Sequence, residues 1–501
     1  MPGCRPQREG TPHELFQKLL ARPGTIHVLV RKSSKDKFDA LLAQMGFDPK
    51  RVVAVYGDLG KPRLGLSPTQ VKQLAGKVKH LFHLAAIYDL TADEESQIRA
   101  NVDGTKHAMQ LGVAVKAGCF HHVSSIAAAG LYPGVFKEDM FDEAEGLDDP
   151  YFRTKHDSEG MVRREYPRPY RIYRPAIVLG HSQTGEIDKI DGPYYFFRLI
   201  KRMRALLPQW VPTIGIEGSR LNMVPVDYVA DAMDWIAHKP GLDGHCFHLT
   251  DPAPQRVGEA LNTFARAANA PQMTMRVDAR MFAFVPPMVR GAIFNLPPVK
   301  RFTNMMLRDL GIPRQVLKYI NYPTRFDSRE TERALKGSKI KLPKLESYAW
   351  RLWDYWERHL DPDLFIDRSL SGKVKGSTVL ITGGSSGIGR AAAIKVAAAG
   401  ARTIVVARKQ DELDAVKAEI EKAGGTCFTY SADLAEMPAC DELVKKVLAE
   451  HETVDVLINN AGRSIRRSVA LSYDRFHDFE RTMGLNYFGS LRLIMGFLPS
   501  M

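Results

Sequence analysis

Hydrophobic and polar residues follow two recurring patterns along the chain. Short apolar runs of four or five residues alternate with longer segments in which apolar residues recur at helical spacing. This alternation predicts a parallel β-sheet covered by helices. The runs that predict strands are Ile26–Val30, Val52–Tyr56, His80–Leu84, Phe120–Val123 and Tyr170–Tyr173, and the pattern restarts with Thr378–Ile381, Thr403–Val406, Cys427–Tyr430 and Val454–Ile458.

Three short motifs occur twice, in the same order, each after a predicted strand or at the start of a predicted helix. The first set is Gly57–Leu59, His83–Ala86 and Asn101–Gly104, and the second is Ala432–Leu434, Asn459–Gly462 and Asn486–Gly489. Repetition in register predicts two units of one architecture. We therefore predict an α/β fold of two tandem Rossmann-type, doubly wound parallel-sheet domains, at residues 1–360 and 377–501. A linker is expected at residues 361–376, and a substrate subdomain at about residues 190–345.

Residues 382–389 read TGGSSGIG and lie between a predicted strand and an alanine-rich helix. Gly383 permits the tight turn, Gly387 lets the backbone approach a pyrophosphate, and Gly389 lets helix and strand pack closely. The helix N-terminus adds N–H donors and a positive dipole. This context predicts a dinucleotide-binding loop formed by Gly383, Ser385, Gly387, Ile388 and Gly389.

The strand that follows ends at Arg408, where an acidic residue would bind a ribose 2′-hydroxyl. An arginine suits a 2′-phosphate, which favours NADPH over NADH, although a solvated surface arginine is the alternative interpretation. We expect Asp433 near the adenine, and Asn459, Ala461 and Gly462 beneath the adenine ribose. In the first unit, the corresponding cofactor-binding positions are Arg31, Asp58, Ala85 and Ala86.

Candidate catalytic groups occur in the first unit. Tyr151 and Lys155 are four residues apart, which places them on one face of a helix. An ammonium group beside a tyrosine favours the tyrosinate, so Tyr151 could exchange a proton with a carbonyl oxygen near neutral pH. Ser124 and Ser125 follow a predicted strand, where a hydroxyl could hydrogen-bond to the same oxygen.

Together these motifs resemble the short-chain dehydrogenase/reductase family. The second unit is similar to the classical branch, with TGxxxGxG, an Asp-Leu pair, NNAG and a later asparagine, Asn486. The first unit resembles the extended branch, through His83–Ala86, Asn101, Tyr151–Lys155, Tyr173–Pro175 and Asn222–Asp227. The resemblance implies that Ser125, rather than Ser124, acts with Tyr151 and Lys155, and that Asn486 is the catalytic-shell asparagine of the second unit.

Each unit departs from the family pattern. Counting back from Arg31 places the three motif glycines of the first unit at Pro6, Glu9 and Pro12, so we expect weak NADPH binding there. In the second unit, the Tyr-x-x-x-Lys pair of the family does not occur before Met501. We therefore expect that both domains are incomplete and that this sequence is an interior part of an intact enzyme.

Longer stretches resemble the bacterial alcohol-forming fatty acyl-CoA reductases. They are residues 121–132, 191–197, 207–218, 321–327, 354–365 and 459–468, within a resemblance that covers residues 13–501. It implies that the C-terminal unit reduces long-chain acyl-CoA to fatty aldehyde and the N-terminal unit reduces the aldehyde to fatty alcohol, both with NADPH. Two alternatives remain open: a sugar-nucleotide or sterol oxidoreductase of the extended branch, and a catalytically inactive dinucleotide-binding fragment.

Composition narrows the expected partners. The chain of 501 residues has a net charge of +13, but its Lys and Arg residues are dispersed and no recognition motif accompanies them, which argues against nucleic acid. A basic surface suits an anionic cofactor, coenzyme A or a membrane surface. The apolar segment Met281–Pro298, with basic flanks, could border an acyl tunnel, rest on a membrane, or form an ordinary subdomain.

The five cysteines are scattered and lack metal-ligand spacing, so we expect no metal and a cytoplasmic protein with reduced thiols. No run of eighteen apolar residues occurs. Peripheral contact with the inner face of the membrane and a homo-oligomeric state are both compatible with these features.

Overall fold

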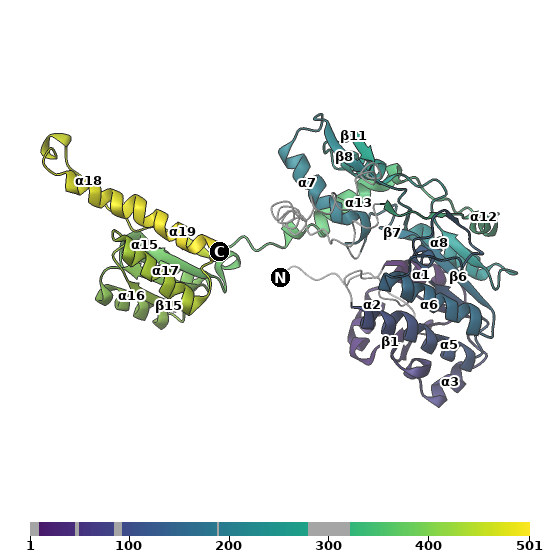
Figure 1. Cartoon of the computed structure of the whole chain (residues 1–501). Coiled ribbons are helices and arrows are strands. Elements are labelled where there is room, and N and C mark those ends of the chain that lie inside the picture. Colours follow the sequence, from purple (N-terminus) through teal and green to yellow (C-terminus); the bar gives the residue numbers. More distant parts are fainter. Residues whose placement is uncertain (1–9, 46–49, 85–92, 188–189, 279–320) are drawn as a thin grey trace. The chain divides into compact units, whose positions relative to one another are not determined.

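The fold is taken from a computed structural model of the chain, which describes residues 10–45, 50–84, 93–187, 190–278 and 321–501 (Figure 1). The chain divides into two compact units, Met1–Asp361 and Pro362–Met501, and each is described by itself. Among the described residues, no helix combines the length and the apolar composition needed to cross a bilayer.

The first unit contains a parallel four-stranded sheet and a separate parallel pair. The sheet has the order β10-β6-β4-β3, and its strands are β3 (His80–His83), β4 (Cys119–Val123), β6 (Tyr170–Pro175) and β10 (Cys246–Leu249). The pair consists of β1 (Ile26–Val30) and β2 (Val52–Tyr56).

Helices cover both faces of the four-stranded sheet. Because side chains alternate between the faces of a strand, Tyr173 and Phe247 face one core and Ile172 and Cys246 face the other. The first core includes side chains of α1 (Gly10–Leu20) and α8 (Val226–His238), which contact each other, and the second includes side chains of α5 (Gly104–Ala114) and α6 (Pro150–Glu165).

A smaller region of the first unit has its own core. Two short parallel pairs, β7 (Ile177–Leu179) with β9 (Met223–Pro225) and β8 (Thr213–Glu217) with β11 (Met273–Asp278), accompany three helices. This core includes aromatic side chains from α7 (Phe197–Leu206), α9 (Val257–Ala267) and α13 (Leu345–His359). The apolar segment Met281–Pro298 lies outside the described residues.

The second unit has a parallel sheet of order β15-β14-β13-β16 with helices on both faces (Figure 1). Its strands are β13 (Thr378–Thr382), β14 (Arg402–Ala407), β15 (Thr426–Ser431) and β16 (Val456–Ile458). One face packs against α15 (Gly387–Ala398) and α16 (Gln410–Lys422), and the other against α17 (Met437–His451) and α19 (Ser490–Phe497). Both units therefore confirm the predicted Rossmann-type α/β class, and each predicted strand appears with ends that shift by at most two residues.

Part of the segment between the units folds with the second one. Residues 362–364 form a single 3-10 turn, and α14 (Leu370–Val374) is a short helix capped by Ser369. Val374 is buried in the core of the second unit, and the Gly376 N–H donates a hydrogen bond to the Gly400 carbonyl (2.9 Å). The end of the segment predicted as a linker therefore fixes the start of β13.

Candidate functional site

The glycine loop of the second unit joins the end of β13 to the start of α15. Gly383 and Gly387 have φ values of +64° and +54°, in the left-handed region that favours glycine. A Cβ on Gly389 would overlap the carbonyl oxygen of Gly383, so this glycine keeps the helix start against the strand end. A Cβ on Gly387 would meet no described atom within 4 Å, which leaves the space in front of this backbone open. An open, N–H-rich helix start is suited to a phosphate group.

An asparagine that the sequence analysis did not select holds this loop in place. The Asn460 amide Nδ2 donates to the carbonyl oxygens of Thr382 (3.0 Å) and Gly383 (3.1 Å). In return, Thr382 Oγ1 accepts hydrogen bonds from the backbone N–H groups of Asn460 and Ala461, both at 3.0 Å. The sequence signal for this role was the pair of adjacent asparagines after the strand. The family motif instead led to the prediction of Asn459, Ala461 and Gly462 as cofactor-binding residues.

The remaining cofactor candidates of the second unit lie near the C-terminal ends of its strands. Ser385 Oγ donates to Glu412 (2.9 Å), and Ile388, in the first turn of α15, is 82% exposed. Hydrogen bonds from Lys409 and Ser385 hold the pKa of Glu412 below its usual value. Arg408 directly follows β14 and is exposed.

Both units carry their motif asparagine in a π-helical turn, a feature often found at functional sites. Asn486 lies in the turn Gly484–Gly489, and its side-chain amide makes two 2.8 Å hydrogen bonds with the backbone of Arg463. Asn101 lies in the turn Ile98–Asp103, and its Nδ2 donates to Thr154 Oγ1 (3.2 Å) on α6. The two amides therefore fix different neighbours, a loop in the second unit and α6 in the first.

The repeated motifs also make equivalent contacts. A Cβ on Gly104 would lie 2.9 Å from the Leu59 side chain, and a Cβ on Gly489 would overlap the Leu434 carbonyl oxygen. The preceding aspartates act alike: Asp58 accepts from the Gly60 N–H (2.9 Å), and Asp433 accepts from the Ala435 N–H (3.0 Å). The close approach at each glycine shows that the sequence repeat is a structural one.

The candidate catalytic residues of the first unit lie on elements that contact one another. Tyr151 is in the first turn of α6, where Asp149 caps the helix, and Lys155 is one turn further on. Ser125 follows β4 and caps the 3-10 turn η4 (Ile126–Ala129), which packs against α6. A hydrogen bond between His156 Nδ1 and the Ala128 carbonyl (3.0 Å) joins the two elements. Burial lowers the pKa of Lys155 to about 8, and the nearby Glu159 carboxylate opposes this shift.

The structure describes two of the four cofactor-binding residues predicted for the first unit. Arg31 is exposed and precedes the 3-10 turn Lys32–Ser34, and Asp58 is half-buried after β2. Ala85 and Ala86 lie outside the described residues. Within the described part of the chain, no group of three or more His, Cys, Asp or Glu residues is arranged to hold a metal ion.

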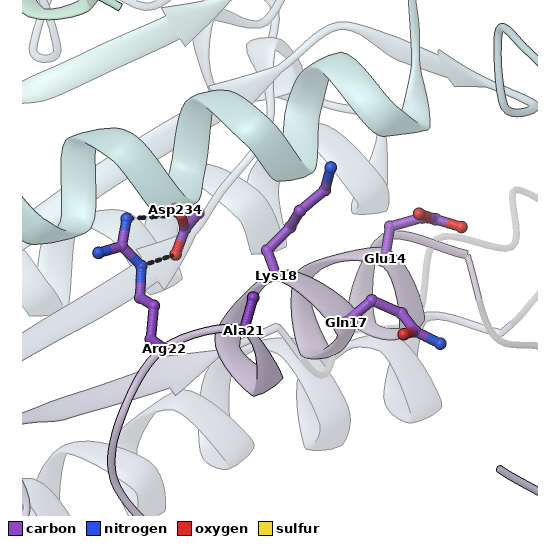
Figure 2. A pocket seen from close by; sticks show the side chains of 6 residues that line it. All are labelled: Glu14, Gln17, Lys18, Ala21, Arg22 and Asp234. Carbon is purple, nitrogen blue, oxygen red and sulfur yellow. Dashed lines mark hydrogen bonds and ion pairs between the residues drawn. The ribbon is translucent and has the colours of Figure 1, made fainter.

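A surface depression of about 510 Å³ in the groove between α1 and α8 is separate from these candidates. Arg22 forms a bidentate ion pair with Asp234, with both N–O distances at 2.7 Å (Figure 2). Its lining contains none of the candidate catalytic residues and consists of Glu14, Gln17, Lys18, Ala21, Arg22 and Asp234. Because acidic and basic groups alternate there, the depression offers no net charge for an anionic substrate.

Comparison with known families assigns both units. Residues 13–233 match the NAD-binding family described as male sterility protein, and residues 377–501 match the short chain dehydrogenase family. The chain is a tandem oxidoreductase of the short-chain dehydrogenase/reductase type. The prediction of an NAD(P)-dependent oxidoreductase family is thereby confirmed.

Curated relatives agree with this assignment, and a solved structure shares the fold. A fatty acyl-CoA reductase of Acinetobacter baylyi is 56% identical over 128 residues, which are 26% of this chain and 43% of that protein. A fatty acyl-CoA reductase of Mycobacterium tuberculosis is 47% identical over 144 residues, which are 28% of this chain and 49% of that protein. The matched stretch thus spans less than half the length of each relative. The terminal R domain from the myxalamid PKS-NRPS biosynthetic pathway shares the fold, with a TM-score of 0.54 and 23% identity over 70% of this chain and 88% of that chain.

Proposed function

We propose that this tandem oxidoreductase reduces long-chain fatty acyl-CoA to fatty aldehyde and then to fatty alcohol, with NADPH as the reductant. The observation that carries the proposal is the 56% identity to a fatty acyl-CoA reductase. The tandem order suits a two-step reduction, in which the second unit acts on the thioester and the first on the aldehyde. A tethered second site would receive the poorly soluble aldehyde at a high effective concentration.

The two steps balance with one hydride and one proton each. The first hydride adds to the thioester carbon, and the C–S bond breaks to release the coenzyme A thiol and the aldehyde. The second hydride adds to the aldehyde carbon, and a proton completes the alcohol. NADPH, when bound, supplies the hydride in each step.

The residues of the second unit fit a dinucleotide phosphate. The loop Gly383–Gly389 and the N-terminus of α15 would hold the pyrophosphate, because the space beside Gly387 is open and the first N–H groups of a helix have no partner within the helix. Arg408 would pair with the 2′-phosphate, which is the basis for proposing NADPH rather than NADH. Asn460 keeps the loop in the shape that this binding requires.

Three residues of the first unit would perform the proton transfer of the aldehyde step. Ser125 would hydrogen-bond to the carbonyl oxygen, and Tyr151 would donate its phenolic proton to that oxygen as the hydride arrives. The Lys155 ammonium would favour the tyrosinate left behind. A small shift in their relative positions would slow the step, since proton transfer requires hydrogen-bond distances.

The test is the rate of NADPH oxidation by the purified chain with palmitoyl-CoA and, separately, with a long-chain aldehyde. We expect aldehyde turnover that falls by about 100-fold or more in Tyr151→Phe, because general acid catalysis contributes factors of this size. Full aldehyde activity in that variant would refute the role of Tyr151. Turnover of a UDP-sugar or a sterol instead, or tight NADPH binding without any turnover, would refute the acyl substrate and support one of the two alternatives.

A further inference from the structure

A second charged residue lies on the catalytic helix of the first unit, further into the protein. Glu159 follows Lys155 by one helical turn and Tyr151 by two, so the three residues share one face of α6. The side chains of Glu159 and of its partner Arg174 on β6 are both 0% exposed. Burying an isolated carboxylate is strongly unfavourable, so its partners determine what Glu159 can do.

Four hydrogen bonds converge on the Glu159 carboxylate. Arg174 donates from Nη2 (2.6 Å) and Nε (3.0 Å), Arg163 donates from Nε (2.8 Å), and Ser124 donates from Oγ (2.7 Å). Burial opposes ionisation, but the Arg174 guanidinium and these hydrogen bonds hold the pKa of Glu159 well below its usual range. Glu159 is therefore a carboxylate at neutral pH.

Ser124 connects the Glu159 carboxylate to the end of β4, close to Ser125. Its hydroxyl points into the buried network, while its backbone N–H donates to the Tyr173 carbonyl (2.8 Å). The next residue, Ser125, has extended backbone, and successive side chains of extended backbone point to opposite sides. A fixed Ser124 thus directs the Ser125 hydroxyl away from the network.

Arg174 is held from the other side by a histidine. Its Nη1 lies 3.1 Å from His248 Nε2, and His248 Nδ1 lies 2.7 Å from the Asp327 carbonyl. Because arginine only donates and a carbonyl only accepts, His248 carries its proton on Nδ1 and is neutral. Burial, which lowers the pKa of His248 to about 3, agrees with this state. The anchor keeps the guanidinium aimed at Glu159.

The groups that face Lys155 come from three elements. They are His83 on β3, His122 on β4, and Tyr151 and Glu159 on α6. Burial lowers the pKa of His83 to about 4 and that of His122 well below its usual value, so both histidines are neutral at pH 7. Among these groups, Glu159 supplies the negative charge that favours a Lys155 ammonium.

We propose that Glu159 is a positioning residue that fixes Ser125 through Ser124 and keeps Lys155 in its ammonium form beside Tyr151. The claim about Lys155 rests on its position, buried one helical turn before Glu159 on the same face of α6. The claim about Ser125 rests on the proposed function, because its test measures aldehyde reduction. The two parts of the proposal therefore need separate measurements.

The first measurement follows lysine ionisation in the full chain. With ¹³Cε-labelled lysine, the signal that titrates near pH 8 and disappears in Lys155→Arg reports this residue. In Glu159→Gln we expect its midpoint to fall by about one pH unit or more, because a nearby opposite charge is removed. The matched control is Asp157→Asn, which removes an exposed carboxylate from the same helix and should leave the midpoint unchanged.

An unchanged Lys155 midpoint in folded Glu159→Gln would overturn the proposal. If that variant does not fold, because Arg174 is left without its counter-charge, the double variant Glu159→Gln/Arg174→Met removes both buried charges. The Lys155 midpoint should fall in the double variant as well, and an unchanged midpoint there would also refute the proposal.

The second measurement separates positioning from a general structural role. Ser124→Ala retains the Glu159–Arg174 pair, so we expect an unchanged Lys155 midpoint but a kcat for aldehyde reduction about tenfold lower, with little change in KM. In Glu159→Gln, the alkaline limb of the rate profile should move to lower pH as Lys155 loses its proton earlier. Full kcat in Ser124→Ala would refute the link to Ser125. If the unaltered chain turns over no aldehyde, the proposed function fails, while the lysine titration still decides the role of Glu159.

Discussion

The strands of the two units bury different kinds of side chain. In the first unit, β4, β6 and β10 bury His121, His122, Arg174 and His248. In the second unit, β13 and β14 bury mainly valine, leucine and isoleucine side chains. The glycine loop after β13 presents backbone N–H groups, and an apolar sheet is sufficient support for it. The proton transfer proposed for the first unit requires side chains of set charge and position, and these require buried polar partners.

The units also differ in how their sheets are joined. In the second unit, β13 lies between β14 and β16 in one sheet. The first-unit strands equivalent to β14 and β16 are β1 and β3, and among the described strands these two belong to different sheets. Leu29 on β1 is 38% exposed, while Val405 on β14 is 0% exposed. A strand flanked on both sides is thus more fully buried than the same strand with one described neighbour.

The largest effect that would test this difference is expected from Gly389→Val. The new side chain would overlap the Gly383 carbonyl and the Asn460 amide, so the glycine loop could not keep its shape. We expect NADPH affinity, measured by fluorescence titration, to fall by about 100-fold or more, which corresponds to roughly 3 kcal/mol. Ala391→Ser, at an exposed position of the same helix, is the control. Retained NADPH affinity in Gly389→Val would show that binding does not depend on this loop.

Acidification should separate the two units by an effect of similar size. Burial lowers the pKa of His80 and His83 to about 4, and it also lowers the pKa values of His121, His122 and His248. Because these folded-state pKa values lie below the ordinary value of 6.5, the stability gained from neutral histidines is present above pH 6.5. It is lost as the pH falls towards 4, by roughly 3 kcal/mol for His83 alone.

The second unit contains one described histidine with a lowered pKa, His451, so its stability should change less over the same pH range. Hydrogen exchange monitored by mass spectrometry, with peptides assigned to each unit, measures both changes in one sample. Replacement of the exposed His245 by Gln serves as a control that should not alter the acid response. Equal losses of protection in the two units would contradict the proposed importance of the buried histidines.

The smallest expected effect concerns cofactor choice. Removing the guanidinium in Arg408→Ala should weaken NADPH binding about tenfold and leave NADH binding nearly unchanged, because only NADPH carries the 2′-phosphate. Affinities for both cofactors, measured on the same protein, give the ratio directly. An unaltered ratio would favour the interpretation of Arg408 as a solvated surface residue.

The sequence predicted local features well and long-range ones poorly. Strand positions follow from apolar runs, and the glycine loop follows from a motif of eight residues. Both can therefore be predicted from residues that are close together in the chain. The network of Ser124, Glu159, Arg174 and His248 cannot, because its hydrogen-bonded pairs are separated by 15 to 74 residues. These residues come together because of the strand order β10-β6-β4, which cannot be predicted from a local sequence pattern. Asn460 was missed for a different reason, since its role lies in backbone contacts rather than in cofactor contact.

The two π-helical turns have a consequence for how the asparagines are specified. Each turn holds one more residue than an α-helical turn, and one residue corresponds to about 100° of rotation about the helix axis. The direction of each amide is therefore set by a count of residues as well as by residue type. A one-residue deletion within Ile98–Asp103 would turn the Asn101 amide away from α6 as effectively as its replacement by another side chain. At this point of the chain, the number of residues determines the direction of the amide as much as the residue type does.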